Sequence, residues 1–166
     1  MELSDISVIG APLFLSSSSD VDKTQTQLGI KFPVGYREYV TELGEGTLGG
    51  NYIRIYPPMR ILSGMNNIYE WRERIVEYWF WDESPDILTQ TQASDCVIIG
   101  DTVNGDEIVV HPSNHERIYI LPRDEEFIPF VDGGLFKALE WLCSSGVLTE
   151  PFAEREFNPF DSNEEA

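Results

Sequence analysis

The segment over residues 28–40, Leu-Gly-Ile-Lys-Phe-Pro-Val-Gly-Tyr-Arg-Glu-Tyr-Val, limits the possible folds most strongly. It predicts that one helix ends, that a tight connection follows and that a second helix starts. Gly29 suits the residue after a helix C-terminus, where φ is positive. Pro33 suits the first helical position, where no backbone N–H is needed. Apolar residues then recur at i, i+3, i+4 and i+7, at Tyr36, Tyr39, Val40 and Leu43. The second helix is therefore expected to run from Pro33 to Leu43 and to stop at Gly44.

Hydrophobic patterns elsewhere predict three more helices. The first is expected to have Asp20 as its N-cap and to end at Leu28, the next to cover about residues 66–81, and the last about residues 134–145. Strands are expected where residues alternate or form apolar runs, at 51–56, 96–100, 107–111 and 117–121, with a brief fifth at 126–128. Asn104-Gly105 predicts a hairpin between the second and third strands, whereas the glycine-rich residues 44–50 predict a flexible loop.

This order of elements indicates an α+β fold. Consecutive strands joined by tight turns pair antiparallel, so we expect an antiparallel sheet of about four to six strands with helices packed on one face. The 166 residues and the 42% hydrophobic content suit a single domain, over residues 1–150. Residues 151–166 form an acidic tail that carries Phe152, Phe157 and Phe160. Two alternatives remain for this tail, a frayed end or a segment whose phenylalanines dock on the domain.

The charge of the chain restricts its partners. Asp and Glu number 29 against 11 Lys and Arg, which gives a formal net charge of −18. Such a surface repels phosphate backbones and anionic membranes, so direct binding to nucleic acid or to a membrane is not expected. It attracts a basic protein partner and raises the rate of association. Acidity that serves only solubility is the alternative.

The sequence also bears on location. No run of about 18 apolar residues is present, which predicts no transmembrane helix. Residues 1–14 hold Glu2 and Asp5 but no Lys or Arg, whereas a secretory signal starts with positive charge. Cys96 and Cys143 lie in apolar segments, so we expect two buried free thiols and a reducing, cytoplasmic compartment.

No motif predicts a catalytic site, a cofactor or a bound metal ion. The loop over residues 44–50 lacks the Gly-Lys-Ser/Thr of a phosphate-binding loop. The polar residues around the predicted hairpin suit a turn better than a calcium loop. His111 and His115, even with Cys96 nearby, fall short of the four ligands of a structural zinc site.

Three segments of the chain, taken together, resemble a known family. The first is Leu28-Gly29-Ile30-Lys31-Phe32-Pro33 with Tyr36 and Tyr39, the second is Tyr52 to Pro57, and the third combines Ile98-Ile99-Gly100-Asp101, Asn104-Gly105-Asp106, Ile118-Tyr119 and a last helix with Phe136, Leu139 and Trp141. In motif, order and spacing they are similar to the SUKH superfamily, which joins a fungal cell-wall assembly regulator to many bacterial toxin-immunity proteins. The chain departs from that pattern at Gly44-Glu45-Gly46, where Asn-Gly-Gly is more usual.

The resemblance implies an α+β domain that binds proteins and has no known catalytic centre. In bacteria it implies neutralisation of a toxin, often a nuclease, encoded beside it. Together with the charge, this favours a non-catalytic immunity protein, monomeric or weakly dimeric, that binds and blocks a basic toxin domain. The alternatives are a regulatory scaffold or adaptor without a toxin partner, an enzyme, and a mimic of nucleic acid whose carboxylates replace phosphates.

One candidate for partner binding lies at the end of the predicted third helix. Trp81 follows Phe80 and precedes Asp82 and Glu83, so we expect it to be exposed. An exposed aromatic side chain ringed by acids would anchor a basic partner.

A second group of candidates lies in the predicted sheet. Tyr52, Arg54 and Tyr56 alternate along one face of a strand, and the sequence leaves open whether that face is exposed. An acidic patch beside the predicted hairpin completes the set, with Asp101, Asp106 and Glu107.

Overall fold

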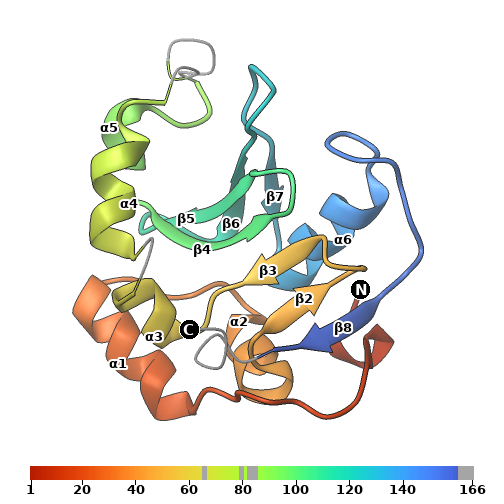
Figure 1. The fold of residues 1–166 in the computed structure, drawn as a ribbon. Helices are drawn as coiled ribbons and strands as arrows, with labels where there is room; N and C mark the ends of the chain where they lie inside the picture. The colour runs from red at the N-terminus through yellow and green to blue at the C-terminus, as the bar shows by residue number, and fades with distance from the viewer. Residues whose placement is uncertain (65–66, 79–80, 82–85, 161–166) are drawn as a thin grey trace.

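The computed structural model describes residues 1–64, 67–78, 81 and 86–160, which fold around one eight-stranded sheet (Figure 1). The strands lie in the order β1-β8-β2-β3-β4-β5-β6-β7, and every neighbouring pair within this sheet is antiparallel except β1 with β8. Their bounds are β1 Ser7–Val8, β2 Gly46–Leu48, β3 Ile53–Ile55, β4 Val97–Thr102, β5 Glu107–His111, β6 Asn114–Leu121, β7 Phe130–Asp132 and β8 Glu156–Pro159.

Helices of different lengths surround the sheet. The α-helices are α1 Ser18–Leu28, α2 Tyr36–Glu38, α3 Pro58–Leu62, α4 Ile68–Ile75, α5 Gln90–Ala93 and α6 Leu135–Ser144; a 3₁₀ turn η1 covers Leu3–Asp5, and a π-helical turn η2 covers Tyr39–Leu43. The α+β class is therefore confirmed. None of the helices in the described residues is long and apolar enough to cross a membrane.

The sheet is larger than the four to six strands expected. The difference comes from short strands without a periodic pattern: β1 has two residues, β2 lies in the glycine-rich loop, and β8 lies in the acidic tail. The brief strand expected at residues 126–128 is also absent, and β7 follows instead at Phe130–Asp132. These strands exist because long-range partners complete their hydrogen bonds, which local periodicity does not encode.

Helices cover both faces of the sheet, whereas the sequence predicted one face. Consecutive strand residues point to opposite faces, and Val97–Gly100 of β4 and Glu107–Val110 of β5 are all buried. Figure 1 shows α4 on one side of these strands and α6 on the other. We name the faces after these helices, the α4 face and the α6 face. Glu107 points to the α4 face, because it accepts a hydrogen bond from Trp71 of α4.

The α6 face holds a large part of the hydrophobic core. Tyr39 of η2 packs there against Phe157 of β8 and Phe136 of α6, with ring centroids 5.8 and 6.4 Å apart. Leu48, Ile53 and Ile118 share this face through the strand register and are fully buried. Cys96 and Cys143 are buried and free, as expected.

The first helix ends as predicted but starts earlier. Gly29 caps its C-terminus with a φ of 65°. The N-cap is Ser17 and not Asp20: the Ser17 hydroxyl accepts a hydrogen bond from the Asp20 amide at 3.0 Å, and Asp20 lies in the first turn. Four consecutive serines, residues 16–19, precede Asp20, so the sequence offers several N-caps and does not choose between them.

The second helix begins at Tyr36, not at Pro33. Gly35 has a φ of 92°, which interrupts a helix from Pro33. Tertiary contacts require this turn: a Cβ at Gly35 would lie 2.7 Å from the Phe136 ring, and the Leu135 amide donates to the Val34 carbonyl at 2.8 Å. Packing against the start of α6 therefore overrides the helical pattern around Pro33.

Other helix boundaries also differ. The helix expected over residues 66–81 is α4, which is described only from Ile68 to Ile75. Pro58 starts α3 where the sequence predicted only the end of a strand, and the short α5 was not expected. The last helix is close to the prediction of residues 134–145.

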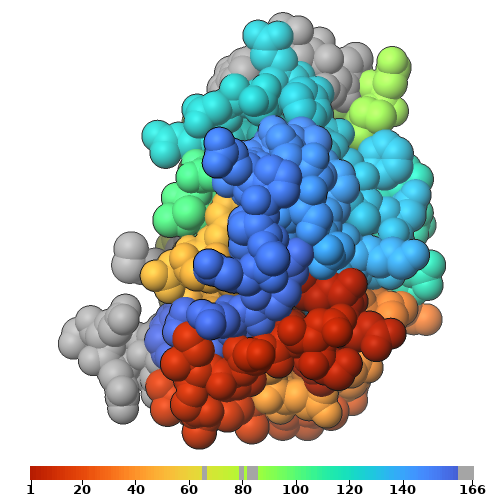
Figure 2. Space-filling model, turned by 90° about the vertical axis from the view of Figure 1, so that its right-hand side faces the viewer, coloured from red at the N-terminus to blue at the C-terminus, as the bar shows by residue number. Residues whose placement is uncertain are grey.

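The described part of the C-terminal tail belongs to the sheet. Strand β8 lies between β1 and β2, and Phe157 is fully buried. Phe152 packs edge-on against Tyr52, with ring centroids 5.7 Å apart. Figure 2 shows this C-terminal segment (blue) lying along the surface next to the N-terminal segment (red). Up to Phe160, therefore, the tail docks and does not fray.

Candidate partner-binding site

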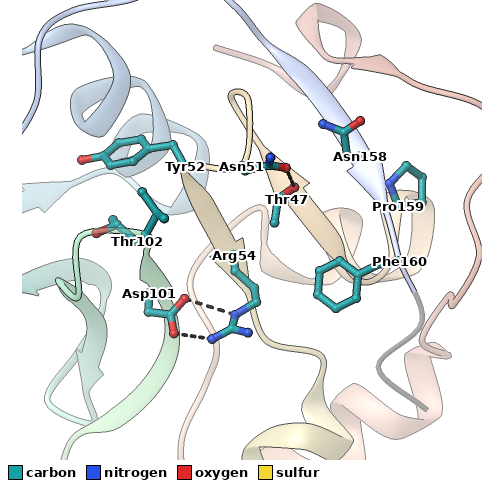
Figure 3. A pocket seen from close by; sticks show the side chains of 10 residues that line it. Thr47, Asn51, Tyr52, Arg54, Asp101, Thr102, Asn158, Pro159 and Phe160 are labelled. Carbon is teal, nitrogen blue, oxygen red and sulfur yellow. Dashed lines mark hydrogen bonds and ion pairs between the residues drawn. The ribbon is translucent and has the colours of Figure 1, made fainter. Parts of the chain in front are cut away.

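The centre of the candidate site is an ion pair between neighbouring strands on the α4 face. Arg54 of β3 lies opposite Asp101 of β4 in the register. The Arg54 guanidinium donates from Nε to Asp101 Oδ1 at 3.2 Å and from an Nη atom to Oδ2 at 2.6 Å (Figure 3). The side chains are 33% and 21% exposed, so the pair is open to a partner. This answers the question that the sequence left open: the strand face with Arg54 is accessible.

Tyr56 supports this pair from below. Its hydroxyl donates to Asp101 Oδ2 at 2.5 Å, and the residue is 1% exposed. Arg54 and Arg60 both lie over its ring, 5.4 and 4.7 Å from the centroid. Burial and the neighbouring Asp101 carboxylate raise the pKa of Tyr56 above its ordinary value, so the hydroxyl stays a donor. Tyr56 is therefore buried beneath the pair and positions Asp101.

A pocket of about 530 Å³ opens on one side of the pair. Polar side chains from four strands and a turn line it, among them Thr47, Asn51, Arg54 and Asn158. Thr47 donates to the Asn51 side chain at 3.0 Å. In Figure 3, Arg54 lies between Asp101 and the ring of Phe160, whereas the Tyr52 ring points away from the pair.

A second pocket of about 440 Å³ shares Asp101 and extends toward α4. Glu107, which faces Asp101 across β4 and β5, lies beneath it and is 8% exposed. The Glu107 carboxylate accepts from Trp71 Nε1 at 2.6 Å, from the Tyr78 hydroxyl, and from Arg74 at 3.4 Å. Arg74 and Arg123 add cationic side chains to the lining.

Burial perturbs the ionisation of this second cluster. Burial raises the pKa of Glu107, although the Tyr78, Trp71 and Arg74 donors oppose the shift, and the Asp101 carboxylate adds to it. Burial, followed by the Glu107 carboxylate, raises the pKa of Tyr78 to about 12. Glu107 thus joins α4 to the sheet and is not part of an exposed acidic patch.

Asp106 and Tyr52 have structural roles away from the open face. Asp106 accepts from the Thr102 hydroxyl at 2.8 Å and from the Arg123 amide at 3.1 Å, so it fixes the predicted β4–β5 hairpin. Gly105 in that turn has a φ of 91°, as the Asn-Gly signal predicts. Tyr52 is turned toward Phe152. Of the candidate residues in the sheet, only Arg54 and Asp101 present partly exposed side chains in the pockets.

Trp81 is not the exposed anchor that the sequence predicted. Its side chain is 6% exposed, and its indole N–H donates to the Ile75 carbonyl at 2.8 Å. The indole therefore satisfies an acceptor at the end of α4, where intrahelical donors run out. Asp82 and Glu83, which were expected beside it, lie outside the described residues.

Sequence reasoning missed most of the pocket lining. Thr47 and Asn158 lie in β2 and β8, neither of which was expected, and they reach Arg54 through the register of β8, β2 and β3. Sequence reasoning placed Arg74 in a helix, but no short-range sequence pattern predicts that this helix packs over Glu107. For this pocket, the sequence signal was the alternation of Arg54 with the apolar residues Ile53 and Ile55, which indicates that Arg54 lies on the opposite strand face from the two isoleucines.

The candidate site is a polar surface with paired charges at its centre. The acidic groups at its centre are engaged: Asp101 by Arg54 and Tyr56, and Glu107 by Trp71, Tyr78 and Arg74. No group of three or more His, Cys, Asp or Glu residues in the described chain is placed to hold a metal ion. What the surface offers is a rigid set of donors and acceptors around a paired charge.

Comparison with family models identifies the family of the chain. Residues 16–135, well over half of the chain, match the model of the SMI1 / KNR4 family (SUKH-1). The match runs from just before α1 to the first residue of α6, and thus includes the strands that carry Arg54 and Asp101. No curated protein matches the chain. The resemblance to the SUKH superfamily is confirmed, and the chain belongs to the SMI1 / KNR4 family (SUKH-1).

Proposed function

We propose that this protein is a non-catalytic immunity protein that binds and neutralises a basic toxin domain. Family membership carries the proposal: SUKH domains interact with proteins and are generally non-catalytic. The open, polar α4 face with the Arg54–Asp101 pair supports it. Such a surface can form directed hydrogen bonds to a partner without undergoing rearrangement.

The net charge of −18 supports the basic character of the partner. Acidic side chains raise the rate of encounter with a positively charged protein, and close packing then slows dissociation. Inhibition would follow from occlusion: a partner that covers the two pockets on the α4 face would have its own substrate-binding surface blocked. The partner-binding residues we propose there are Arg54, Asp101, Asn158 and Arg74.

The second candidate function is a regulatory scaffold or adaptor of the same fold. The family match favours it equally, since it concerns residues 16–135 and does not specify the partner. The two candidates differ in what the partner does. A toxin partner loses an activity when it is bound, whereas a scaffold's partner keeps its activity.

Coexpression with a candidate toxin tests the proposal. The candidate is the toxic domain encoded beside this chain, and the measurements are growth of the coexpressing cells and activity of the purified domain with increasing amounts of the chain. We expect growth to be restored and activity to be lost at a 1:1 ratio. A bound domain that stays active would contradict the immunity role and leave the scaffold role.

A matched pair of variants tests the site. Asn158→Tyr fills the pocket beside Arg54 without a change of charge, and Thr91→Tyr adds the same bulk at an exposed position on α5. We expect Asn158→Tyr to weaken toxin binding at least tenfold and Thr91→Tyr to change it less than twofold, as measured by calorimetry. Equal affinities for both variants would remove the α4 face from the interface.

A further inference from the structure

A groove of about 870 Å³ lies between the N-terminal segment and η2, away from the Arg54–Asp101 pair. We call it the N-terminal groove. Five apolar side chains line it, namely Leu3, Ile6, Val8, Leu15 and Leu43. All but Leu43 precede residue 16, so they lie outside the part of the chain that matches the family model.

Apolar side chains in this segment are unusually exposed. Ile9, Leu13 and Leu15 are 50, 59 and 51% exposed, although they lie within seven residues of one another. In Figure 2 this N-terminal segment (red) lies at the molecular surface. Several exposed apolar side chains within one short segment of a folded protein mark a candidate interaction surface.

Acidic side chains border the N-terminal groove. Glu2 and Glu42 line the groove, Asp5 lies in η1 beside it, and all three are exposed. Within the described residues none of the three forms an ion pair, and neither Lys nor Arg lines the groove. The first basic residue of the chain is Lys23. The groove therefore has an uncompensated negative rim.

The main chain at the groove is also available for pairing. Strand β1 lies at one end of the sheet and pairs only with β8 in the described sheet. Ser7 and Ile9 donate their amides toward β8, so the intervening Val8 directs its main-chain groups to the opposite, open edge. Such an edge accepts an additional strand.

We propose that the N-terminal groove binds an extended, basic segment of the protein partner, with apolar side chains in the groove and Lys or Arg beside Glu2, Asp5 and Glu42. The proposal rests on the proposed function, because it names the part of the partner that the acidic surface attracts. Charge selects this occupant: a second copy of the chain would bring the same acids together, and an anionic membrane would be repelled.

Binding of the toxic domain to groove variants tests this proposal. We expect Leu13→Ser combined with Leu15→Ser to weaken affinity at least tenfold, and Glu42→Lys to slow association several-fold at low salt. The matched controls are Val34→Ser, at a side chain that is 63% exposed before α2, and Glu150→Lys, at an exposed acid after α6. We expect them to bind within twofold of the unchanged chain. If the groove variants bind like these controls, the groove proposal is wrong, whereas the immunity role stands.

A peptide titration tests the groove without the toxin. The probe is a synthetic Lys-Val-Lys-Val-Lys-Val-Lys peptide, added to the isotope-labelled chain and followed through backbone amide shifts. Saturable shifts at residues 6–9, 13–15 and 41–43, which are absent with a Glu-Val repeat, would support the groove even if no toxin binds. Shifts spread over the surface or confined to the Arg54 pocket would overturn it. So would a dimer, seen by sedimentation, that Leu13→Ser with Leu15→Ser dissociates, because a second copy would then occupy the groove.

Discussion

The α4 face and the N-terminal groove are two surfaces of one acidic protein, and they handle charge in opposite ways. On the α4 face the acids have basic partners: Asp101 has Arg54, Glu107 has Arg74 and Asp132 has Arg117. In the groove, by contrast, Glu2 and Glu42 border apolar side chains with no cation in the lining. A net charge of −18 therefore says little about any one surface; its effect depends on where the acids lack partners.

The difference assigns separate tasks to the two surfaces. Paired charges on the α4 face hold strands and a helix in place, so substitution of these residues lowers the stability of the fold. Because the charges are already paired, this face gives a partner a fixed arrangement of donors and acceptors and little net electrostatic attraction. Unpaired acids around exposed leucines contribute little to folding, but attract cations over a Debye length of about 8 Å in physiological salt. We therefore expect the first surface to govern stability and the second to govern the rate of association.

The largest expected effect is on the stability of the α4 face. Asp101→Ala removes the acceptor of Arg54 and of the buried Tyr56 hydroxyl. Because a buried donor is left unpaired, we expect the free energy of unfolding to fall by about 2–3 kcal/mol. Glu42→Ala in the groove should change it by less than about 0.5 kcal/mol. Urea denaturation measures both, and equal losses would erase the distinction between the surfaces.

The pH dependence of Glu107 is the next test. Burial raises the pKa of Glu107 in the folded state above that in the unfolded chain, so its contribution to stability is fully present below the unfolded pKa, about 4.3. This contribution is lost as the pH rises through the folded pKa. Relative to Glu107→Gln, the unchanged chain should therefore lose stability as the pH increases from about 4 to 7.

Urea denaturation at several pH values, performed on both proteins, measures this difference. Charge repulsion elsewhere acts on both chains equally and cancels in the comparison. A difference that grows in favour of the unchanged chain with rising pH would show that the hydrogen bonds from Trp71 and Tyr78 outweigh the cost of burial.

The parts of the fold that sequence reasoning predicted have local causes. Gly29 caps α1, Asn104-Gly105 makes the β4–β5 turn, and the apolar face of α6 has helical spacing, so each signal lies within a few residues of its effect. The start of α2 at Tyr36 and the existence of β8 depend on contacts with residues about 100 positions away in the chain, such as Gly35 with Phe136 and Thr47 with Asn158. Local patterns do not contain those contacts.

The candidate site divides in the same way. Arg54 was found because it alternates with buried isoleucines, and Asp101 because it precedes a recognisable turn. The prediction that Trp81 is exposed was wrong, because it was inferred from the acidic neighbours of Trp81. In the structure the indole folds back and donates to the Ile75 carbonyl. The N-terminal groove had no signal at all, because apolar residues in a segment without periodicity do not reveal which of them become buried.

The smallest expected effect separates paired from unpaired acids most directly. Glu42→Lys and Asp132→Lys both change the net charge by two units, but the Asp132 carboxylate accepts two hydrogen bonds from the Arg117 guanidinium, at 2.7 and 3.0 Å. At low salt we expect Glu42→Lys to raise the melting temperature by about 1 °C, because it relieves repulsion at the groove. Asp132→Lys should lower the melting temperature, because this substitution places a lysine beside Arg117.

Both shifts should shrink in 0.5 M NaCl, where screening shortens the range of charge interactions. Thermal melts of the two variants at both salt concentrations measure this, and shifts of the same sign would mean that only the net charge matters and that the two surfaces do not differ.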